Sequence, residues 1–306
     1  MAIPTSSELP HKLLWAGVYP QLLRYAVPDS RFNYDFLKFT PDFRGSSDTV
    51  ERIAKLSCYK EARTILVTGD NSVEGLRHRA LKDGKRVLVG TYRLRRGFVV
   101  LDPKRIGDSK LELAACLDAM EKPGIGRAVS LSQLRDEGYK IDMCALGGLV
   151  FNEQGVVIWE GSALFEVQWA LLQDLKMLDV TTPVIAVAHE CQVVDEAQYG
   201  IDVIKPDKNG EVQCDFIITP ERVLEVKGAV KPVGGVDFQK VDPEALNNIP
   251  PLQELKGIRM MEQIMSSNGF GSKEKEGEER KPPSAEEQMG IDIVERLMKG
   301  LKGLKG

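Results

Sequence analysis

Short apolar runs alternate with amphipathic stretches through the middle of the chain. The runs TILVT, RVLVG and FVVL occupy residues 64–68, 86–90 and 98–101, and residues 73–82 carry a helical spacing that ends at Gly84. Buried strands that alternate with helices are typical of a mostly parallel sheet covered on both faces. The pattern therefore predicts an α/β fold.

The longest apolar run, IDMCALGGLVF at residues 141–151, contains Gly147 and Gly148. We expect one long strand here, interrupted at the two glycines, where another group can approach the backbone closely. The turn sequence NEQG at 152–155 and the apolar VVIW at 156–159 then predict a hairpin.

The pattern continues beyond this hairpin. Residues 162–177 have the apolar spacing of an amphipathic helix, and the apolar runs at 183–188 and 214–218 predict two more strands. Thr219 is a suitable helix cap, and Pro220 suits the first helical position. A helix is therefore expected to begin there.

The first quarter of the chain reads as irregular, because aromatic residues and prolines are mixed in it without a clear period. Two candidate capping boxes predict helix starts further on. Asp48 is followed three residues later by Glu51, and Ser130 is followed by Gln133.

The composition changes after about residue 230. We expect residues 1–230 to form the α/β domain and residues 231–283 to form an irregular, partly disordered linker with a helix at 252–265. Residues 284–306 begin with a capping box and carry one apolar stripe, which predicts a C-terminal amphipathic helix. That helix is expected to dock on its own domain or on a protein partner.

Composition narrows the function classes. The 306 residues include 41 basic and 45 acidic side chains, a net charge of −4, which gives no general attraction for nucleic acid or anionic lipid. No segment approaches the roughly 20 apolar residues of a membrane helix, and the N-terminus lacks the pattern of a secretory signal. Five scattered cysteines without a C-x-x-C pair favour a reducing compartment. We expect a cytoplasmic protein.

Most motifs of common enzymes are missing from the sequence. It has no phosphate-binding P-loop, no G-x-G-x-x-G after a strand and no G-x-S-x-G, and Val193 stands where a zinc-protease motif opening at His189 needs its second histidine. The basic cluster of Arg93, Arg95 and Arg96, with Gly97 after it, suits a phosphate or carboxylate, which guanidinium binds bidentately. The alternative is a solvated loop that pairs with surface acids.

Longer stretches resemble a known family. They are FTPDFRGSSDTVERIAKL (39–56), RALKDGKRVLVGTYRLRRGFVVLDP (79–103), GSALFEVQWALL (161–172), PVIAVAHECQVVDE (183–196) and CDFIITPERVLEV (214–226). Together with Asp142 they resemble the 5-formyltetrahydrofolate cyclo-ligase (methenyltetrahydrofolate synthetase) family, and within it the methenyltetrahydrofolate synthetase domain-containing branch. The resemblance covers roughly residues 39–226.

This resemblance implies a three-layer α/β domain akin to ribose-5-phosphate isomerases and CoA transferases. It also implies a folate-type small molecule as ligand, with ATP and Mg²⁺. In the family's reaction ATP phosphorylates the formyl oxygen of 5-formyltetrahydrofolate, a neighbouring ring nitrogen attacks the activated carbon, and phosphate leaves to give 5,10-methenyltetrahydrofolate. Such chemistry calls for cations around the triphosphate and a carboxylate for Mg²⁺.

The resemblance also assigns roles to individual residues. The implied nucleotide or phosphate site consists of Arg93, Arg95, Arg96, Gly97, Gly155 and Gly161. The implied substrate site contains Gln192, Thr219 and His189, and the implied metal ligand is Glu166. Local alternatives stay open: Gln192 and Thr219 can satisfy backbone groups at strand ends, His189 suits a hydrogen-bonded core position, and Glu166 suits the first turn of a helix.

The family's phosphate loop is altered in this chain. Trp159 and Ala163 stand where the family has glycines, Leu164 replaces a tyrosine, and Glu160 replaces a basic residue. A reversed charge beside a phosphate changes the sign of an interaction of about 1 to 4 kcal/mol at 4 Å. Lys12 and Arg24 are weak candidates for the family's N-terminal basic residues. The sequence thus leaves two hypotheses: an active cyclo-ligase, or a degenerate homologue that acts as a binding or interaction protein linked to RNA or to another partner.

Overall fold

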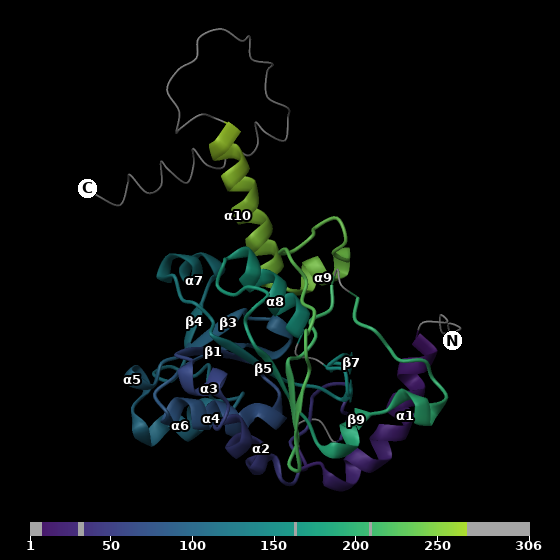
Figure 1. Ribbon diagram of the computed structural model, residues 1–306. Coiled ribbons are helices and arrows are strands. Elements are labelled where there is room, and N and C mark those ends of the chain that lie inside the picture. The colour runs from purple at the N-terminus through teal and green to yellow at the C-terminus, as the bar shows by residue number, and fades with distance from the viewer. Residues whose placement is uncertain (1–7, 30–33, 162–163, 208–209, 268–306) are drawn as a thin grey trace, which may run out of the picture. The chain divides into compact units, whose positions relative to one another are not determined.

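The computed structural model describes residues 8–29, 34–161, 164–207 and 210–267 (Figure 1). The strands are β1 (Thr64–Val67), β2 (Arg86–Gly90), β3 (Phe98–Leu101), β4 (Arg127–Val129), β5 (Met143–Gly147), β6 (Val150–Asn152), β7 (Val157–Trp159), β8 (Val184–Val187), β9 (Val193–Val194), β10 (Phe216–Ile218) and β11 (Val223–Glu225). The α-helices are α1 (Glu8–Tyr25), α2 (Ser46–Ile53), α3 (Ser57–Glu61), α4 (Glu74–Lys82), α5 (Pro103–Ile106), α6 (Leu111–Ala115), α7 (Leu131–Glu137), α8 (Phe165–Asp174), α9 (Pro243–Asn248) and α10 (Pro250–Ser267).

The described strands form one large sheet and one small sheet. The large sheet has eight strands in the order β11-β10-β8-β5-β1-β2-β3-β4, and its central strands from β10 to β2 run parallel. The outer strands β11, β3 and β4 are antiparallel to their neighbours. The predicted mostly parallel sheet is confirmed.

Side chains alternate between the two faces of this sheet, as strand geometry requires. In β1, Leu66 faces one hydrophobic core and Ile65 and Val67 face the other. The first core is covered by α7, α8 and the start of α10, and the second by α2, α3, α4 and α6 (Figure 1). The domain therefore has the three layers that the resemblance implies.

The strand predicted at 141–151 is interrupted at Gly147 and Gly148, as expected, but its two parts belong to different sheets. β5 ends at Gly147, and β6 begins at Val150 in a separate three-stranded sheet of order β7-β6-β9. A side chain at Gly147 would collide with Ser72 Oγ at 2.3 Å, and one at Gly148 with the ring of Phe151 at 2.5 Å. The glycines therefore let the chain turn between two sheets, and the predicted hairpin forms as the antiparallel pair β6–β7.

The irregular N-terminal region is also a wrong prediction, since α1 is a helix of 18 residues with Pro20 inside it. Leu14, Val18 and Leu22 recur every four residues and are fully buried. They pack with Val150 and Ile158 of the small sheet in a third hydrophobic cluster. Burial of this stripe explains why the segment folds despite its proline.

One further predicted helix is absent, and another forms but begins two residues earlier than predicted. No helix follows Thr219 and Pro220, because the chain turns there and returns as β11, with the Thr219 N–H donating to the Arg222 carbonyl at 3.0 Å. The helix predicted from Asp48 begins at Ser46 as α2 after Gly45, whose φ of 91° puts it in the left-handed region. The capping box of Ser130 and Gln133 forms at the start of α7.

The C-terminal segment extends the compact domain beyond the predicted boundary at residue 230. The first compact unit runs to Met261, and Val236, Ile249, Leu252 and Leu255 are buried in the core that α8 also covers. The predicted helix at 252–265 falls within α10. The second unit starts at Glu262, and its described residues 262–267 form the end of α10. The predicted helix at 284–306 lies outside the described residues.

In the described ranges no helix combines the length and the apolar character needed to cross a membrane.

Candidate functional site

The parallel strands of the large sheet all end at one edge, and the loops that follow them gather the candidate residues. Along the chain, β1 connects to β2 on one side of it, whereas β5, β8 and β10 lie on its other side. Ligands of open parallel sheets bind outside the carboxyl ends of the strands where the strand order reverses. The end of β1 is that point in this domain.

Asp70 occupies this position, three residues after β1. Its buried carboxylate accepts hydrogen bonds from the Thr68 hydroxyl and from the Gly147 N–H, the latter at 3.2 Å. Burial raises the pKa of Asp70, and these hydrogen bonds oppose the shift. Asp70 is not among the predicted site residues, although a Gly-Asp pair directly after a buried apolar run is a usable signal.

Arg77 of α4 fixes the loop that carries Asp70. Its fully buried guanidinium donates to the carbonyl of Thr68 at 2.6 Å, of Asp70 at 3.0 Å and of Ala115 at 2.8 Å. Burial lowers the pKa of Arg77. The Arg77 guanidinium therefore holds the loop after β1 through hydrogen bonds to its carbonyl oxygens.

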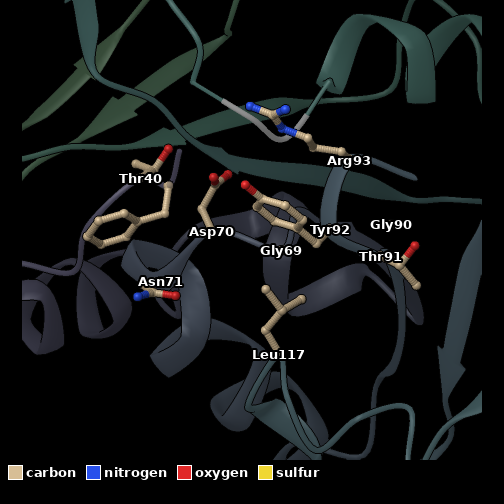
Figure 2. Close-up of a pocket in the computed structure, with 10 residues that line it drawn as sticks. Thr40, Gly69, Asp70, Asn71, Gly90, Thr91, Tyr92, Arg93 and Leu117 are labelled. Carbon is tan, nitrogen blue, oxygen red and sulfur yellow. The ribbon is translucent and has the colours of Figure 1, made fainter. Parts of the chain in front are cut away.

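A pocket opens between the loops after β1 and β2 (Figure 2). Thr40, Asp70, Thr91, Arg93 and Leu117 are among the residues that line it. In the view of Figure 2, Asp70 and Arg93 lie toward one end of the pocket and Leu117 toward the other. A buried acid and an exposed base thus border the same space.

The turn after β2 has an unusual backbone. Arg93 and Leu94 have φ angles of 52° and 53°, a region that residues with a side chain seldom occupy, and such positions cluster at functional sites. The Arg93 guanidinium lies 5.6 Å from the centre of the Tyr92 ring, and the Tyr92 hydroxyl donates to the Lys38 carbonyl at 3.0 Å. The turn therefore fixes the position of Arg93 after the carboxyl end of β2.

The basic cluster divides in two. Arg93 and Arg95 are exposed and line one cleft, here called the arginine cleft, with Gly161, Leu164, Ala245, Asn247, Asn248 and Ile249. Neither guanidinium forms an ion pair with any carboxylate in the part of the chain that the structure describes. Arg96 instead pairs with Glu121 at 2.5 Å, and Arg96 and Gly97 line a different pocket beside Ser130.

Gly161 also lines a second cleft, here called the Lys12 cleft, together with His11, Lys12, Trp159 and Glu160. Trp159 is partly buried, and its ring centre lies 6.1 Å from that of Trp15 on α1. Trp159 is therefore part of the wall that joins the small sheet to α1. Gly155 lies elsewhere, since a side chain on it would meet the Cys214 carbonyl at 2.5 Å.

Glu160 sits at the start of α8, where its carboxylate accepts a hydrogen bond from the Phe165 N–H. Burial, and to a smaller extent Glu166 and Asp70, raise the pKa of Glu160 to about 8, against the lowering effect of that hydrogen bond. The side chain is therefore mainly protonated at pH 7. A neutral Glu160 removes most of the repulsion expected between this residue and a phosphate.

Glu166 does not join the arginines. It lines an apolar pocket with Val167, Val236 and Ala245, and burial, followed by repulsion from Glu211 and Asp207, raises its pKa to about 7. Of the residues described, no three histidine, cysteine or acidic side chains are placed to hold a metal ion. Glu166 is therefore not part of a three-residue metal cluster in the described part of the chain, and its role as the predicted metal ligand stays a prediction.

The predicted substrate residues form hydrogen bonds within the protein; they are His189, Gln192 and Thr219. The Gln192 amide accepts from the His189 N–H at 2.8 Å and donates to the Gly148 carbonyl at 2.8 Å. The Thr219 hydroxyl donates to Glu190 and accepts from the Arg222 N–H at 3.0 Å. These residues line none of the pockets described above.

His189 is held by its neighbours as well. Its Nδ1 accepts from the Cys191 N–H at 3.2 Å, and its ring stacks on Tyr25 with centres 4.0 Å apart. Burial lowers the pKa of His189. The histidine thus acts as a neutral cap of the short helix Glu190–Gln192.

Comparison with known proteins shows which family this chain resembles. A model of the 5-formyltetrahydrofolate cyclo-ligase family matches residues 21–198. Methenyltetrahydrofolate synthase domain-containing proteins of Bos taurus and Danio rerio are 27% identical over 249 residues and 28% identical over 220 residues. These alignments cover 79% and 71% of this chain but 63% and 54% of the relatives, so the chain spans less than two thirds of their length.

Two solved structures are similar at low identity. The 5,10-methenyltetrahydrofolate synthetase of Aquifex aeolicus has a TM-score of 0.41 and 13% identity, with 76% of this chain and 100% of that chain covered. The enzyme of Mycoplasma pneumoniae has a TM-score of 0.37 and 12% identity, with 71% and 99% covered.

Proposed function

Because this chain belongs to the 5-formyltetrahydrofolate cyclo-ligase family, we propose that it binds ATP and a reduced folate side by side at the carboxyl edge of the sheet. The reaction is the ATP-dependent conversion of 5-formyltetrahydrofolate to 5,10-methenyltetrahydrofolate. The observation that carries this proposal is the position of Gly161, which lines both the Lys12 cleft and the arginine cleft.

The two clefts suit two different ligands. The Lys12 cleft offers an ammonium group and the indole of Trp159, which match the phosphates and the flat base of a nucleotide. The arginine cleft offers guanidinium groups and apolar side chains, which match an anionic ligand with a ring. The transferred phosphoryl group and the formyl oxygen then meet beside Gly161.

The residues at this meeting point favour a close approach of phosphate. Gly161 has a φ of 95°, and a side chain there would come within 2.9 Å of Thr40 Oγ1. A side chain at residue 161 would therefore both strain the backbone and collide with Thr40, so this loop conformation requires glycine. Protonated Glu160 adds no negative charge at neutral pH.

Cations of the chain supply the electrostatic part of the reaction. Lys12 and Arg93 each line a cleft that Gly161 also lines, and positive groups near a transferring phosphoryl group stabilise the charge that develops on it. Magnesium accompanies the nucleotide in such reactions and is held by the phosphates and one or two carboxylates, and we assign it no particular protein ligand.

Calorimetry tests the proposal. The full chain is titrated with Mg·ATP, first alone and then with 5-formyltetrahydrofolate present, and the methenyl product is followed by its absorbance. We expect ATP to bind, to bind more tightly with the folate present, and to be consumed as product forms. Absence of any heat from ATP would overturn the proposal and would favour a binding or interaction role.

A matched pair of glycine variants sharpens this test. Gly161→Ala places a methyl group against Thr40, and we expect it to abolish the ATP heat. Gly138→Ala also places an alanine at a positive φ, since Gly138 has a φ of 64°, but nothing lies within 4 Å of the added carbon. This control should lose some stability and keep ATP binding. Equal binding by both variants would remove Gly161 from the site.

A further inference from the structure

Helix α1 carries apolar side chains on two opposite faces. Leu14, Val18 and Leu22 are fully buried and pack on the small sheet. A second apolar stripe is exposed to solvent, here called the outer stripe, and consists of Leu9, Leu13, Ala16, Pro20 and Leu23. At 3.6 residues per turn, the centres of the two stripes lie roughly 180° apart around the helix. The domain therefore uses one of the two apolar faces of α1 for its own core and leaves the other outside.

The outer stripe has the spacing of a contact between two helices. Its residues follow one another at steps of four, three, four and three, so they stay on one face along the helix. Leu9, Leu13 and Leu23 are 53%, 48% and 41% exposed. Single exposed leucines are common on protein surfaces, but a continuous apolar row marks an interaction site. The spacing indicates that the partner surface is a helix.

The outer stripe complements itself when two copies of α1 run antiparallel. Its leucines stand toward the two ends, and the smaller side chains of Ala16 and Pro20 stand near the centre. Antiparallel pairing sets Leu9 and Leu13 of one copy against Leu23 of the other, and two-fold symmetry repeats this contact at the other end. The small central residues let the two helices approach closely.

Charge repulsion does not oppose this pairing. Lys12 and Arg24 border the outer stripe on its two sides, and a two-fold axis keeps each side of one helix against the same side of the other. In an antiparallel pair each cation then lies about 15 Å from its counterpart in the other copy, which is beyond the Debye length at physiological salt.

The size of the outer stripe suits a weak dimer. Because α1 has 18 residues, it is about 27 Å long at a rise of 1.5 Å per residue. Two such stripes bury roughly 600 to 800 Å² in total when they pack together, less than the roughly 1,200 Å² at which stable interfaces begin. Contacts of this size belong to transient complexes, which form and dissociate with concentration.

We infer that two copies of this chain associate through the outer stripe of α1, as a weak antiparallel pair of helices. The inference goes beyond the proposed function and depends on neither ATP nor folate.

Sedimentation equilibrium of the full chain tests the inference. We expect a monomer at low micromolar concentration and a dimer with a dissociation constant of about 100 µM. Leu13→Glu and Leu23→Glu each place a charge inside the contact and should raise the dissociation constant by about tenfold or more. Leu37→Glu is the matched control, because Leu37 is 51% exposed and lies outside α1. It should leave the dissociation constant unchanged.

A mixing experiment tests the antiparallel orientation. Chains with Leu13→Glu are mixed with chains that carry Leu23→Lys, so that antiparallel pairing brings the new acid of one copy close to the new base of the other. We expect the mixture to associate more tightly than either variant alone. A mixture that associates no better than its components rejects the antiparallel pair.

The remaining results are equally decisive. A wild type that stays monomeric at every concentration overturns the inference and leaves the outer stripe to a helix of another protein. A dimer that persists in Leu13→Glu places the contact on a different surface and overturns it too. The same holds for a dimer that Leu37→Glu weakens as much as Leu13→Glu does. Far-UV circular dichroism checks that each variant is folded.

Discussion

The carboxyl edge of the sheet has two halves that differ in how their polar side chains are satisfied. In the β8–β10 half, the polar groups of His189, Gln192 and Thr219 are hydrogen-bonded to groups of neighbouring loops. In the β1–β2 half, Arg93 and Arg95 carry charges with no ion-pair partner among the described residues. Both halves contain predicted site residues, but those of the β8–β10 half find their partners within the protein.

This difference shows why residue type alone does not identify a binding site. A buried polar group needs a partner, and when the protein supplies it the group stabilises the fold and is no longer available. Exposed charges that border a cleft without a protein partner gain most from a ligand. We therefore interpret the polar side chains of the β8–β10 half as structural, and we propose the β1–β2 half as the ligand-binding side.

The largest effect is expected from removing the two exposed arginines. In R93A/R95A, charge-assisted hydrogen bonds to the ligand disappear, and we expect folate affinity measured by calorimetry to fall by about 100-fold. The free energy of unfolding should change by less than roughly 0.5 kcal/mol per site, because both side chains are exposed.

Arg96→Ala is the matched control for this variant. Arg96 belongs to the same basic cluster, but it pairs with Glu121 and lines a different pocket. We expect it to leave folate affinity unchanged. Loss of affinity in Arg96→Ala equal to that of the double variant would show that the cluster acts only through its general charge.

The basic cluster and most strands could be predicted from local sequence. β1, β2 and β3 are continuous apolar runs, because both faces of each strand are buried. They can therefore be predicted from the local sequence alone. The sequence could not predict that Arg96 points to a different pocket from Arg93 and Arg95. This separation depends on the ion pair with Glu121, which lies on a loop 25 residues from Arg96.

The missed elements depend on distant partners. Helix α1 is stable because its stripe packs on β6 and β7, more than 120 residues away in the chain, and a local period interrupted by aromatics and Pro20 gives no sign of that surface. Asn247 and Asn248 lie in a stretch whose composition suggests a linker, and only the burial of Ile249 and Leu252 brings them to the arginine cleft. Tertiary packing decided both cases.

A smaller effect, on stability alone, is expected from a substitution in the β8–β10 half. Gln192→Leu leaves the His189 N–H and the Gly148 carbonyl without their side-chain partner in a buried setting, which costs about 1 to 3 kcal/mol of unfolding free energy. Folate affinity should stay within about twofold at a temperature where the variant is folded. Chemical denaturation and calorimetry measure the two quantities.

Gln198→Leu serves as the control, because Gln198 is exposed and its amide donates to the exposed Asp195 at a long distance of 3.4 Å. We expect its stability to be close to that of the wild type. A Gln192→Leu variant that is stable but no longer binds folate would contradict the structural role and would restore Gln192 as a substrate residue.

The smallest effect concerns the charge of Glu160, beside the meeting point of the two clefts. With a pKa of about 8, the side chain is about nine-tenths protonated at pH 7 and about one-tenth protonated at pH 9. If only the protonated form admits the phosphates, ATP affinity falls by about tenfold over this range. Glu160→Gln is uncharged at every pH, so we expect its ATP affinity to stay level from pH 7 to pH 9.

The same titration gives a stability test with a definite sign. Because the pKa of Glu160 is raised on folding from an ordinary value of 4.5, its protonated form favours the folded state. This contribution is complete below about pH 4.5 and is lost as the pH rises through 8, so Glu160→Gln should gain stability relative to wild type between pH 7 and pH 9. Glu166→Gln controls for a neighbouring acid that titrates near pH 7 in a different pocket and should leave the ATP profile unchanged. An ATP profile that is flat in the wild type would mean that Glu160 does not face the nucleotide, and the altered loop would then tolerate its acidic residue through distance and not through protonation.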